Sequence, residues 1–290
     1  MARLLSILLL AVAPCLRAAT VAGSDALAET LGTAVQRHLA ADGGKHTVAF
    51  RGTLPALEGL DNGTVDVALV ILRESQQVDK TSDGKPIRRI TLGAVAAYVY
   101  AHPSLPVQEV SLGTLAAIFG VGQAADYKFW SDVPGVTFPE PILPFTTGAQ
   151  EHPSSTLFHG IALGGRPFRS TVRLRVDPAF ARDTLASRTN AIVVADQPMP
   201  EGVGRLLRVA DRREGRSSTG YFPDENNIYN ADYPLRLPLV LCVREDRLAS
   251  QRELVRWLLS DEAASHLRRA NFVPAPKLIR ERLAQRLDSN

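Results

Sequence analysis

The chain has 290 residues, of which 45% are hydrophobic and 22% charged, and its formal net charge is +3 at pH 7. This composition supplies a globular core and excludes a disordered chain, a collagen-like fibre and a disulfide-stapled miniprotein. Charged residues are interspersed along the chain, so composition gives no argument for a nucleic-acid partner, and the length suits one large domain or two lobes.

The first 19 residues have the pattern of a secretory signal peptide. Arg3 supplies the positive start, residues 4–13 form an apolar run, and small residues near position 19 suit cleavage. The run is about ten residues long, whereas a membrane-spanning helix needs roughly 20. We therefore expect residues 1–19 to be removed, the protein to be periplasmic or secreted, and no stable membrane insertion after cleavage. Loss of Arg3 and Arg17, with no acidic residue, lowers the formal charge from +3 to +1.

Two other fates of this segment stay open, and both concern the N-terminal region. In the first, Cys15 is lipidated, although Pro14 before it matches the lipoprotein signal poorly. In the second, the segment is retained as an anchor.

After cleavage Cys242 is the remaining cysteine, so no intramolecular disulfide forms. The apolar run 239–243 around Cys242 predicts a buried, unreactive thiol.

Residues 20–72 predict a strand–helix–strand–helix–strand unit. Short apolar strands are expected at 20–23, 47–50 and 65–72. Between them, residues 24–41 carry apolar side chains at helical spacing behind Ser24, and a second helix is expected to begin with Thr53 as its cap. This alternation is typical of a parallel α/β sheet.

The rest of the chain continues to mix strands, helices and loops without a linker or a repeat. We expect a loop at 73–88 and a glycine-rich, aromatic stretch at 120–139. The predicted strands are 90–101, 141–145, 191–195 and 237–243, and the predicted helices are 111–119, 154–163 (with Ser154 as cap) and 252–269. This mixture favours one two-lobed unit over two independent domains.

Several segments, in order along the chain, resemble the type II periplasmic substrate-binding proteins and, within them, the phosphate-binding (PstS-like) branch. The resemblance lies in the start of the first strand and helix, the Gly-x-x-Asp strand, the crossing segment with the helix after it, the Tyr-Pro-Leu segment and the C-terminal helix with Phe-Val-Pro. These segments are residues 21–25, 63–68, 102–119, 226–239 and 252–274.

The resemblance implies an α/β fold of two lobes, with mixed, mostly parallel sheets, flanking helices and two crossover strands. Residues 20–100 plus 235–290 would form the first lobe and residues 101–234 the second, with crossovers near Ala101 and Leu235. The implied function is closure of the two lobes on a ligand held between them.

The residues themselves place a ligand at the same position. Parallel sheets bind ligands beyond the carboxyl ends of their strands, and here three such loops each lead into a helix N-terminus, which favours anions. The candidate ligand-binding residues are Ser24, Asp25, Arg51, Thr53, Ser154, Ser155 and Thr156. A serine or threonine at a helix start also caps the helix without any ligand, so this structural role stays open.

The phosphate pattern of the resembled family is largely missing. That family holds its oxyanion with an arginine shortly before a Ser-Gly-Thr helix start, whereas strand 142–145 contains no arginine and residues 154–156 are Ser-Ser-Thr. The family's aspartate at the end of the third strand falls on Ile71, which cannot accept a hydrogen bond. A phosphate-like oxyanion is therefore one of several small polar or anionic ligands that fit.

Catalytic motifs are absent from the sequence. There is no Gly-x-Ser-x-Gly elbow, no His-Glu-x-x-His and no phosphate-binding glycine loop. His152 near Ser154 and Ser155 is a chance grouping, and neither cysteine nor histidine spacing indicates a metal. The mixed charges at 212–216 and 277–286 predict solvated faces. We therefore expect no enzyme, no cofactor and no metal.

The sequence thus predicts an exported, monomeric solute-binding protein that feeds an ABC-type importer, with its permease as partner, or a membrane sensor. The alternative is a relative of the same fold, outside transport, whose degenerate cleft serves protein–protein interaction. The missing arginine and Ile71 motivate this alternative.

Overall fold

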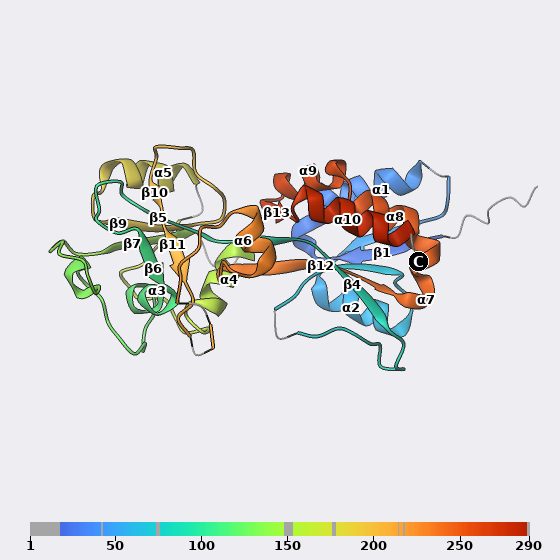
Figure 1. Cartoon of the computed structure of the whole chain (residues 1–290), viewed down its shortest axis with the longest axis horizontal. Coiled ribbons are helices and arrows are strands. Elements are labelled where there is room, and N and C mark those ends of the chain that lie inside the picture. Colours follow the sequence, from blue (N-terminus) through green and yellow to red (C-terminus); the bar gives the residue numbers. More distant parts are fainter. Residues whose placement is uncertain are drawn as a thin grey trace, which may run out of the picture.

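The computed structural model describes residues 18–41, 43–73, 76–147, 153–175, 178–213, 215–216 and 218–288. Residues 1–17 of the expected leader, which include Cys15, lie outside the described residues, and so does His152. Two lobes lie side by side along the longest axis of the molecule (Figure 1). None of the helices in the described ranges combines the length and apolar character needed to cross a membrane.

The first lobe is built on a six-stranded mixed sheet. Its N-terminal strands pair in parallel, as expected for a strand–helix–strand unit, and its other strands run antiparallel. In spatial order the strands are β13 (Phe272–Pro274), β4 (Ile87–Ala96), β12 (Arg236–Arg244), β3 (Val67–Ile71), β1 (Thr20–Gly23) and β2 (Thr47–Phe50).

Helices cover both faces of this sheet, and the side chains of β3 show why. Val67 and Leu69 belong to the large apolar core, whereas Ala68 and Val70 belong to a second, smaller core, as the period of two in a strand requires. The smaller core contains α2 (Thr53–Asn62). The opposite face carries the helices of both chain ends: α1 (Thr33–Ala40), α8 (Arg252–Leu258), α9 (Asp261–Arg269) and α10 (Lys277–Asp288), with the short α7 (Glu245–Leu248) at the lobe's edge (Figure 1).

The second lobe contains a five-stranded sheet and a separate pair of strands. The five strands, in spatial order, are β10 (Arg205–Leu206), β5 (Tyr98–Ala101), β9 (Ala191–Ala195), β7 (Leu143–Thr147) and β8 (Arg173–Arg175). The pair is β11 (Arg208–Ala210) with β6 (Glu109–Ser111). The helices are α3 (Leu112–Phe119), α4 (Pro153–Ile161) and α5 (Pro178–Ser187). The fully buried Trp130 donates its indole N–H to the carbonyl of Asn190 at 2.9 Å, which anchors the glycine-rich stretch.

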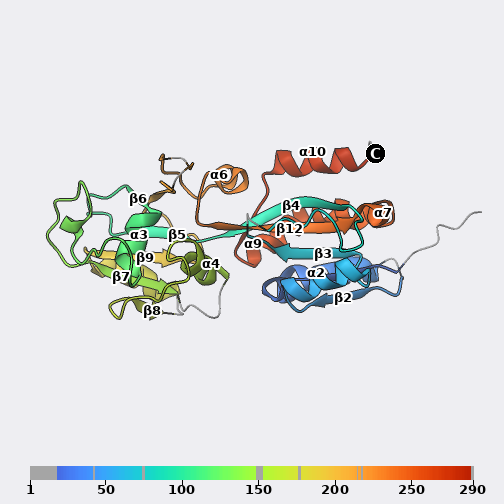
Figure 2. The same ribbon diagram turned by 90° about the horizontal axis from the view of Figure 1, so that it is seen from below.

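The chain changes lobe at two places that lie against each other. β4 ends at Ala96 in the first sheet and β5 begins at Tyr98 in the second, so the first change lies at Ala97, before the expected position near Ala101. The return runs through α6 (Glu225–Asn230) to Leu235 and then into β12. In both views α4 and α6 lie at the junction of the lobes (Figure 1 and Figure 2).

Most predicted strands and helices are confirmed, and four details are corrected. The sheets are mixed, but antiparallel pairs are as frequent as parallel ones in the described ranges, because β12 and β5 return against their neighbours. The helix expected at 252–269 is two helices, because the Ser260 hydroxyl accepts from the N–H of Ala263 and starts α9. Two expected caps, Thr53 and Ser154, lie inside their helices, which begin after Gly52 and at Pro153.

Candidate ligand-binding cleft

A cleft of about 380 Å³ lies at the junction and is lined from both lobes. The first lobe contributes the end of β3 with the residues after it, and the start of β12. The second lobe contributes one face of α4 and the loop that follows β11, and the return segment before β12 completes the wall. This is the position beyond strand ends where α/β folds bind ligands, so we take it as the candidate site.

The described part of the cleft wall is strongly positive. Its charged residues are one aspartate and four arginines: Asp211, Arg73, Arg213, Arg216 and Arg236. Arg236 is 8% exposed and is the first residue of β12, so the backbone of the sheet fixes its position. Arginine presents a planar fork of N–H donors that matches carboxylate and phosphate groups. The wall therefore suits an anion.

Asp211 orders the arginines of the loop after β11. Its carboxylate accepts from the Nε of Arg213 and, at 2.8 Å, from a second guanidinium nitrogen of Arg213, and Arg216 lies 3.9 Å away. Burial favours a raised pKa for the Asp211 carboxyl, but the hydrogen bonds and charge of Arg213, with Arg216, outweigh burial and lower that pKa. The carboxylate is therefore ionised at neutral pH and holds Arg213 at the cleft wall.

The structure brings the predicted residues of the first lobe together at the edge where β1 and β3 end. The N–H of Ser24 donates to the carbonyl of Leu69 at 2.9 Å, and the hydroxyl of Thr53 accepts from the N–H of Ile71 at 3.2 Å. Ser24 is buried, with its hydroxyl 3.3 Å from a carboxylate oxygen of Asp25, whereas Asp25 and Arg51 are exposed. Their neighbour Ile71 lines the 380 Å³ cleft, which these four residues do not.

The predicted residues of the second lobe all lie in the first turns of α4. Pro153 occupies the first helical position, where a missing N–H costs no hydrogen bond. Ser154 and Ser155 are each 2% exposed and point into the lobe, whereas Thr156 is exposed and lines the cleft. One of the seven predicted residues, Thr156, therefore belongs to the cleft wall, and the prediction for the other six remains open.

The arginines of the cleft are the residues that sequence reasoning missed. The cluster at 212–216 was expected to be a solvated face, and Arg213 and Arg216 are indeed half-exposed, but they face the cleft. Arg236 had a usable signal, because it directly follows the Tyr-Pro-Leu segment at the predicted crossover near Leu235. In the structure this arginine lines the cleft.

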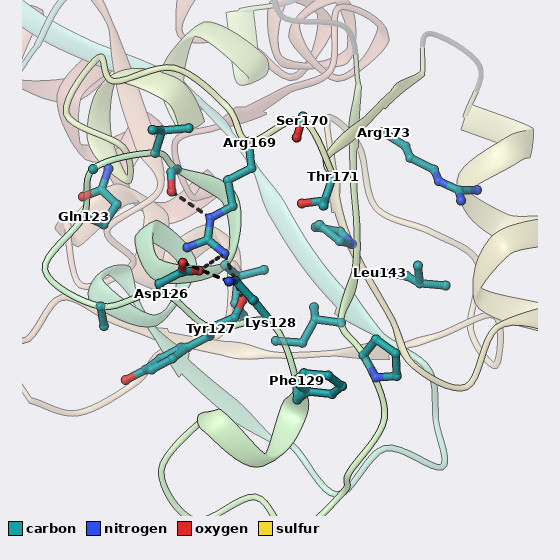
Figure 3. A pocket seen from close by; sticks show the side chains of 18 residues that line it. Gln123, Asp126, Tyr127, Lys128, Phe129, Leu143, Arg169, Ser170, Thr171 and Arg173 are labelled. Atoms are coloured by element: carbon teal, nitrogen blue, oxygen red, sulfur yellow. Dashed lines mark hydrogen bonds and ion pairs between the residues drawn. The ribbon is translucent and has the colours of Figure 1, made fainter.

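A larger groove of about 910 Å³ lies within the second lobe (Figure 3). Its central cation is Arg169, which donates to the carbonyls of Gly120 at 2.9 Å and Tyr127 at 3.1 Å and pairs with Asp126 at 2.5 Å. These contacts hold the loop from Gly120 to Tyr127 in place. The residues that line this groove all belong to the second lobe, so it does not lie between the lobes, and the smaller cleft is the candidate site for a ligand held by both lobes.

Solved structures of the same architecture come from several bacteria. A possible phosphate binding protein from Planctomyces limnophilus is 17% identical with a TM-score of 0.69, over 94% of this chain and 98% of that one. PstS from Borrelia burgdorferi is 14% identical with a TM-score of 0.66, over 90% and 99%. An ABC-type phosphate transport receptor from Vibrio cholerae is 16% identical with a TM-score of 0.61, over 88% and 99%.

At these identities the likeness concerns the fold. No family model and no curated protein matches the sequence. The mixed α/β architecture agrees with the fold expected from the sequence segments. The chain therefore has the two-lobed α/β fold of the type II periplasmic substrate-binding proteins, in the form seen in PstS-like structures.

Proposed function

We propose that the protein is an exported solute-binding protein that closes its two lobes on a small anionic ligand and delivers it to an ABC-type importer or a sensor. The carrying observation is the cleft between the lobes, whose described wall has four arginines and one aspartate. Arginines that converge on a concave site between two bodies are typical of anion recognition.

Closure is the mechanism that this geometry supports. Thr156 and Arg213 belong to the second lobe and Ile71 to the first, so a ligand that contacts all three joins the lobes. Binding then stabilises the closed form by the difference in affinity between the two forms. An importer or sensor would recognise the closed arrangement. The leader in the sequence and the binding proteins among the similar folds support a periplasmic or secreted location.

The proteins of similar fold are named for phosphate, and the cleft here presents different groups. Strand β7 supplies no arginine, and the strand end at Ile71 offers no acceptor for a protonated oxyanion. Arginine instead comes from the loop after β11 and from Arg236. We therefore propose anion binding without assigning inorganic phosphate. The chemistry is binding and release, with no catalytic step, and we propose a monomer.

A thermal-shift screen of the purified chain tests this proposal, with phosphate, sulfate, molybdate and small carboxylates as probes. A ligand of the folded state raises the melting temperature by mass action, equivalent to about 2.7 kcal/mol at a hundredfold excess over Kd. We expect a dose-dependent rise with at least one anion. Arg213→Gln should weaken that anion roughly 10- to 100-fold, the size of one charge-assisted hydrogen bond.

Arg212→Gln is the matched control for this variant. Arg212 is the preceding residue, carries the same charge and pairs with Glu109 at 2.9 Å, outside the cleft wall. It should bind like the parent chain. Equal losses in both variants would indicate general charge attraction, and absence of any thermal rise in a folded sample would contradict anion binding.

A second function, protein–protein interaction, draws support from the larger groove. Val121 and Phe129 line it and are 50% and 45% exposed, so the groove presents apolar side chains to solvent. If no anion shifts the melting temperature, this alternative becomes the better proposal. The variants Phe129→Ser and Arg213→Gln then distinguish the groove from the cleft as the contact surface.

A further inference from the structure

The cleft wall carries apolar side chains as well as arginines. Ile71 at the end of β3, Ile161 on α4 and Leu237 on β12 line the cleft and are partly exposed to it. Leu72 and Leu157 lie behind them, each 1% exposed. Apolar side chains from both lobes therefore face the same space as Arg213 and Arg236.

An inorganic oxyanion fits these apolar side chains poorly. Each of its oxygens needs hydrogen-bond donors once water is removed, because burial of an unpaired charge is costly. Ile71, Ile161 and Leu237 have no donor in their side chains. Closure of the lobes would bring these hydrocarbon groups against any oxygen of the anion that the arginines do not contact.

The size of the cleft points the same way. A tetrahedral oxyanion has five heavy atoms and fills about the space of three waters, on the order of 100 Å³. The cleft measures about 380 Å³, within the range of sites for organic ligands. Ile71, Ile161 and Leu237 bound part of the remaining space, and beside them carbon is a better suited occupant than water.

We propose that the ligand is an organic anion: its carboxylate, phosphonate or phosphate-ester group contacts the arginines, and its hydrocarbon body lies against Ile71, Ile161 and Leu237. This inference rests on the proposed function, since it names the class of anion that the same cleft takes. In this proposal Ile71, which stands where the resembled family has an aspartate, determines specificity, because its side chain contacts the carbon part of the ligand.

Calorimetric titration of the purified chain with two homologous series tests this inference. The probes are inorganic phosphate with methyl-, propyl- and hexylphosphonate, and acetate with butyrate and hexanoate. We expect affinity to rise roughly fourfold for each added CH₂ until the cleft is filled, as burial of a methylene predicts. The heat-capacity change of binding should become more negative along the same series. The series with the higher affinity identifies the charged group.

Ile71→Thr tests the apolar contact. This variant replaces a partly exposed ethyl-bearing side chain with a smaller polar one at a strand end, so we expect it to fold. It should weaken the longest bound member about 5- to 20-fold and the shortest member less than twofold. Leu278→Thr is the control, because Leu278 is 57% exposed on α10 and should leave both members unchanged.

The outcomes separate this inference from the proposed function. Tight binding of inorganic phosphate with weaker binding of every alkyl member would overturn the organic anion and leave anion binding intact. Equal affinity along each series would also overturn it, because the hydrocarbon would then lie in water. No binding by any member of either series would overturn the organic anion, and if sulfate and molybdate also gave no thermal shift, the proposed anion binding would be removed as well.

Discussion

The hydroxyl of Tyr233 donates a hydrogen bond of 2.6 Å to the carbonyl of Ala97. Ala97 is the residue at which the chain first changes lobe, and Tyr233 lies on the return segment. The N–H of Ala97 donates to the carbonyl of Leu235 at 3.0 Å, so one residue on the first passage is bonded to two on the second. Both passages between the lobes are therefore bonded to each other at this position.

Tyr233→Phe is expected to destabilise the protein by about 1–3 kcal/mol, because the buried carbonyl of Ala97 loses its partner. Burial, with smaller contributions from Tyr98 and Tyr100, raises the pKa of Tyr233 well above its usual value, so the hydroxyl stays protonated as a donor. Chemical denaturation measures the change. Tyr229→Phe, on a partly exposed residue of α6, is the control and should stay within about 0.5 kcal/mol of the parent. An unchanged denaturation midpoint for Tyr233→Phe would show that this hydrogen bond does not stabilise the folded protein.

Gly93→Ala should destabilise the first lobe by about 1–3 kcal/mol. Gly93 lies on β4 opposite Pro274 of β13, next to a register shift where Leu92 is the extra residue. A Cβ at Gly93 would clash with the carbonyl oxygen of Val273 and lie 2.9 Å from the Cα of Pro274, and both are backbone atoms that cannot rotate away. The expected effect is a lower melting temperature and faster hydrogen exchange in β13.

Gly113→Ala provides the matched control with the opposite sign. Gly113 is exposed in the first turn of α3, where a Cβ would meet only the Ser111 hydroxyl oxygen at 3.6 Å. Alanine is favoured over glycine in a helix by about 0.5–1 kcal/mol, so this variant should be neutral or more stable. Destabilisation by both variants to the same degree would contradict the argument from close backbone approach.

The sequence predicted the fold best at segments whose local motif also forms hydrogen bonds to a distant part of the chain. The Gly-x-x-Asp segment predicts a strand, and the structure shows Asp66 accepting from the N–H of Thr20 at 2.9 Å, which ties β3 to β1. The Tyr-Pro-Leu segment indicated a crossover, and Tyr233 bonds Ala97 there. Such residues can be recognised in the sequence because their side chains hold distant segments of the backbone together.

The cleft was less accessible to sequence reasoning, because its residues come from separate segments and depend on side-chain direction. Ser155 and Thr156 are neighbours, yet one is buried and the other lines the cleft. Arg212 and Arg213 are neighbours as well. Arg213 and its partner Asp211 line the cleft, whereas Arg212 and its partner Glu109 do not. Hydrophobic periodicity locates a helix or strand, whereas it does not locate the exposed side of a loop.

Cys242 should resist thiol reagents in the native protein. It is fully buried in β12, and burial, with a small opposing effect of Arg89, raises the pKa of its thiol to about 12. The thiolate is the reactive form, so native labelling at pH 8 should be undetectable while labelling in denaturant is complete. A Cys15→Ser background leaves Cys242 as the single cysteine. Rapid labelling of the native chain would contradict the burial of this strand.

His266 should make stability depend on pH below the usual histidine range. It is buried on α9, and burial, followed by the charges of Arg269 and Arg37, lowers its pKa below 6.5, with Glu262 opposing. The unfolded state therefore binds a proton first, so this contribution to stability is complete above about pH 6.5 and is lost as pH falls through the folded-state pKa.

The measurement is the free energy of unfolding from denaturant titrations between about pH 7.5 and pH 5, since this range spans the titration of an ordinary histidine. His266→Gln should reduce the loss of stability on acidification, because glutamine keeps a polar side chain on α9 without binding the proton. His102→Gln is the control, because it removes a histidine from the second lobe and leaves His266 in place, and its profile should follow that of the parent chain. If the three proteins lose stability in parallel across this range, the acid sensitivity comes from carboxyl groups and His266 is silent.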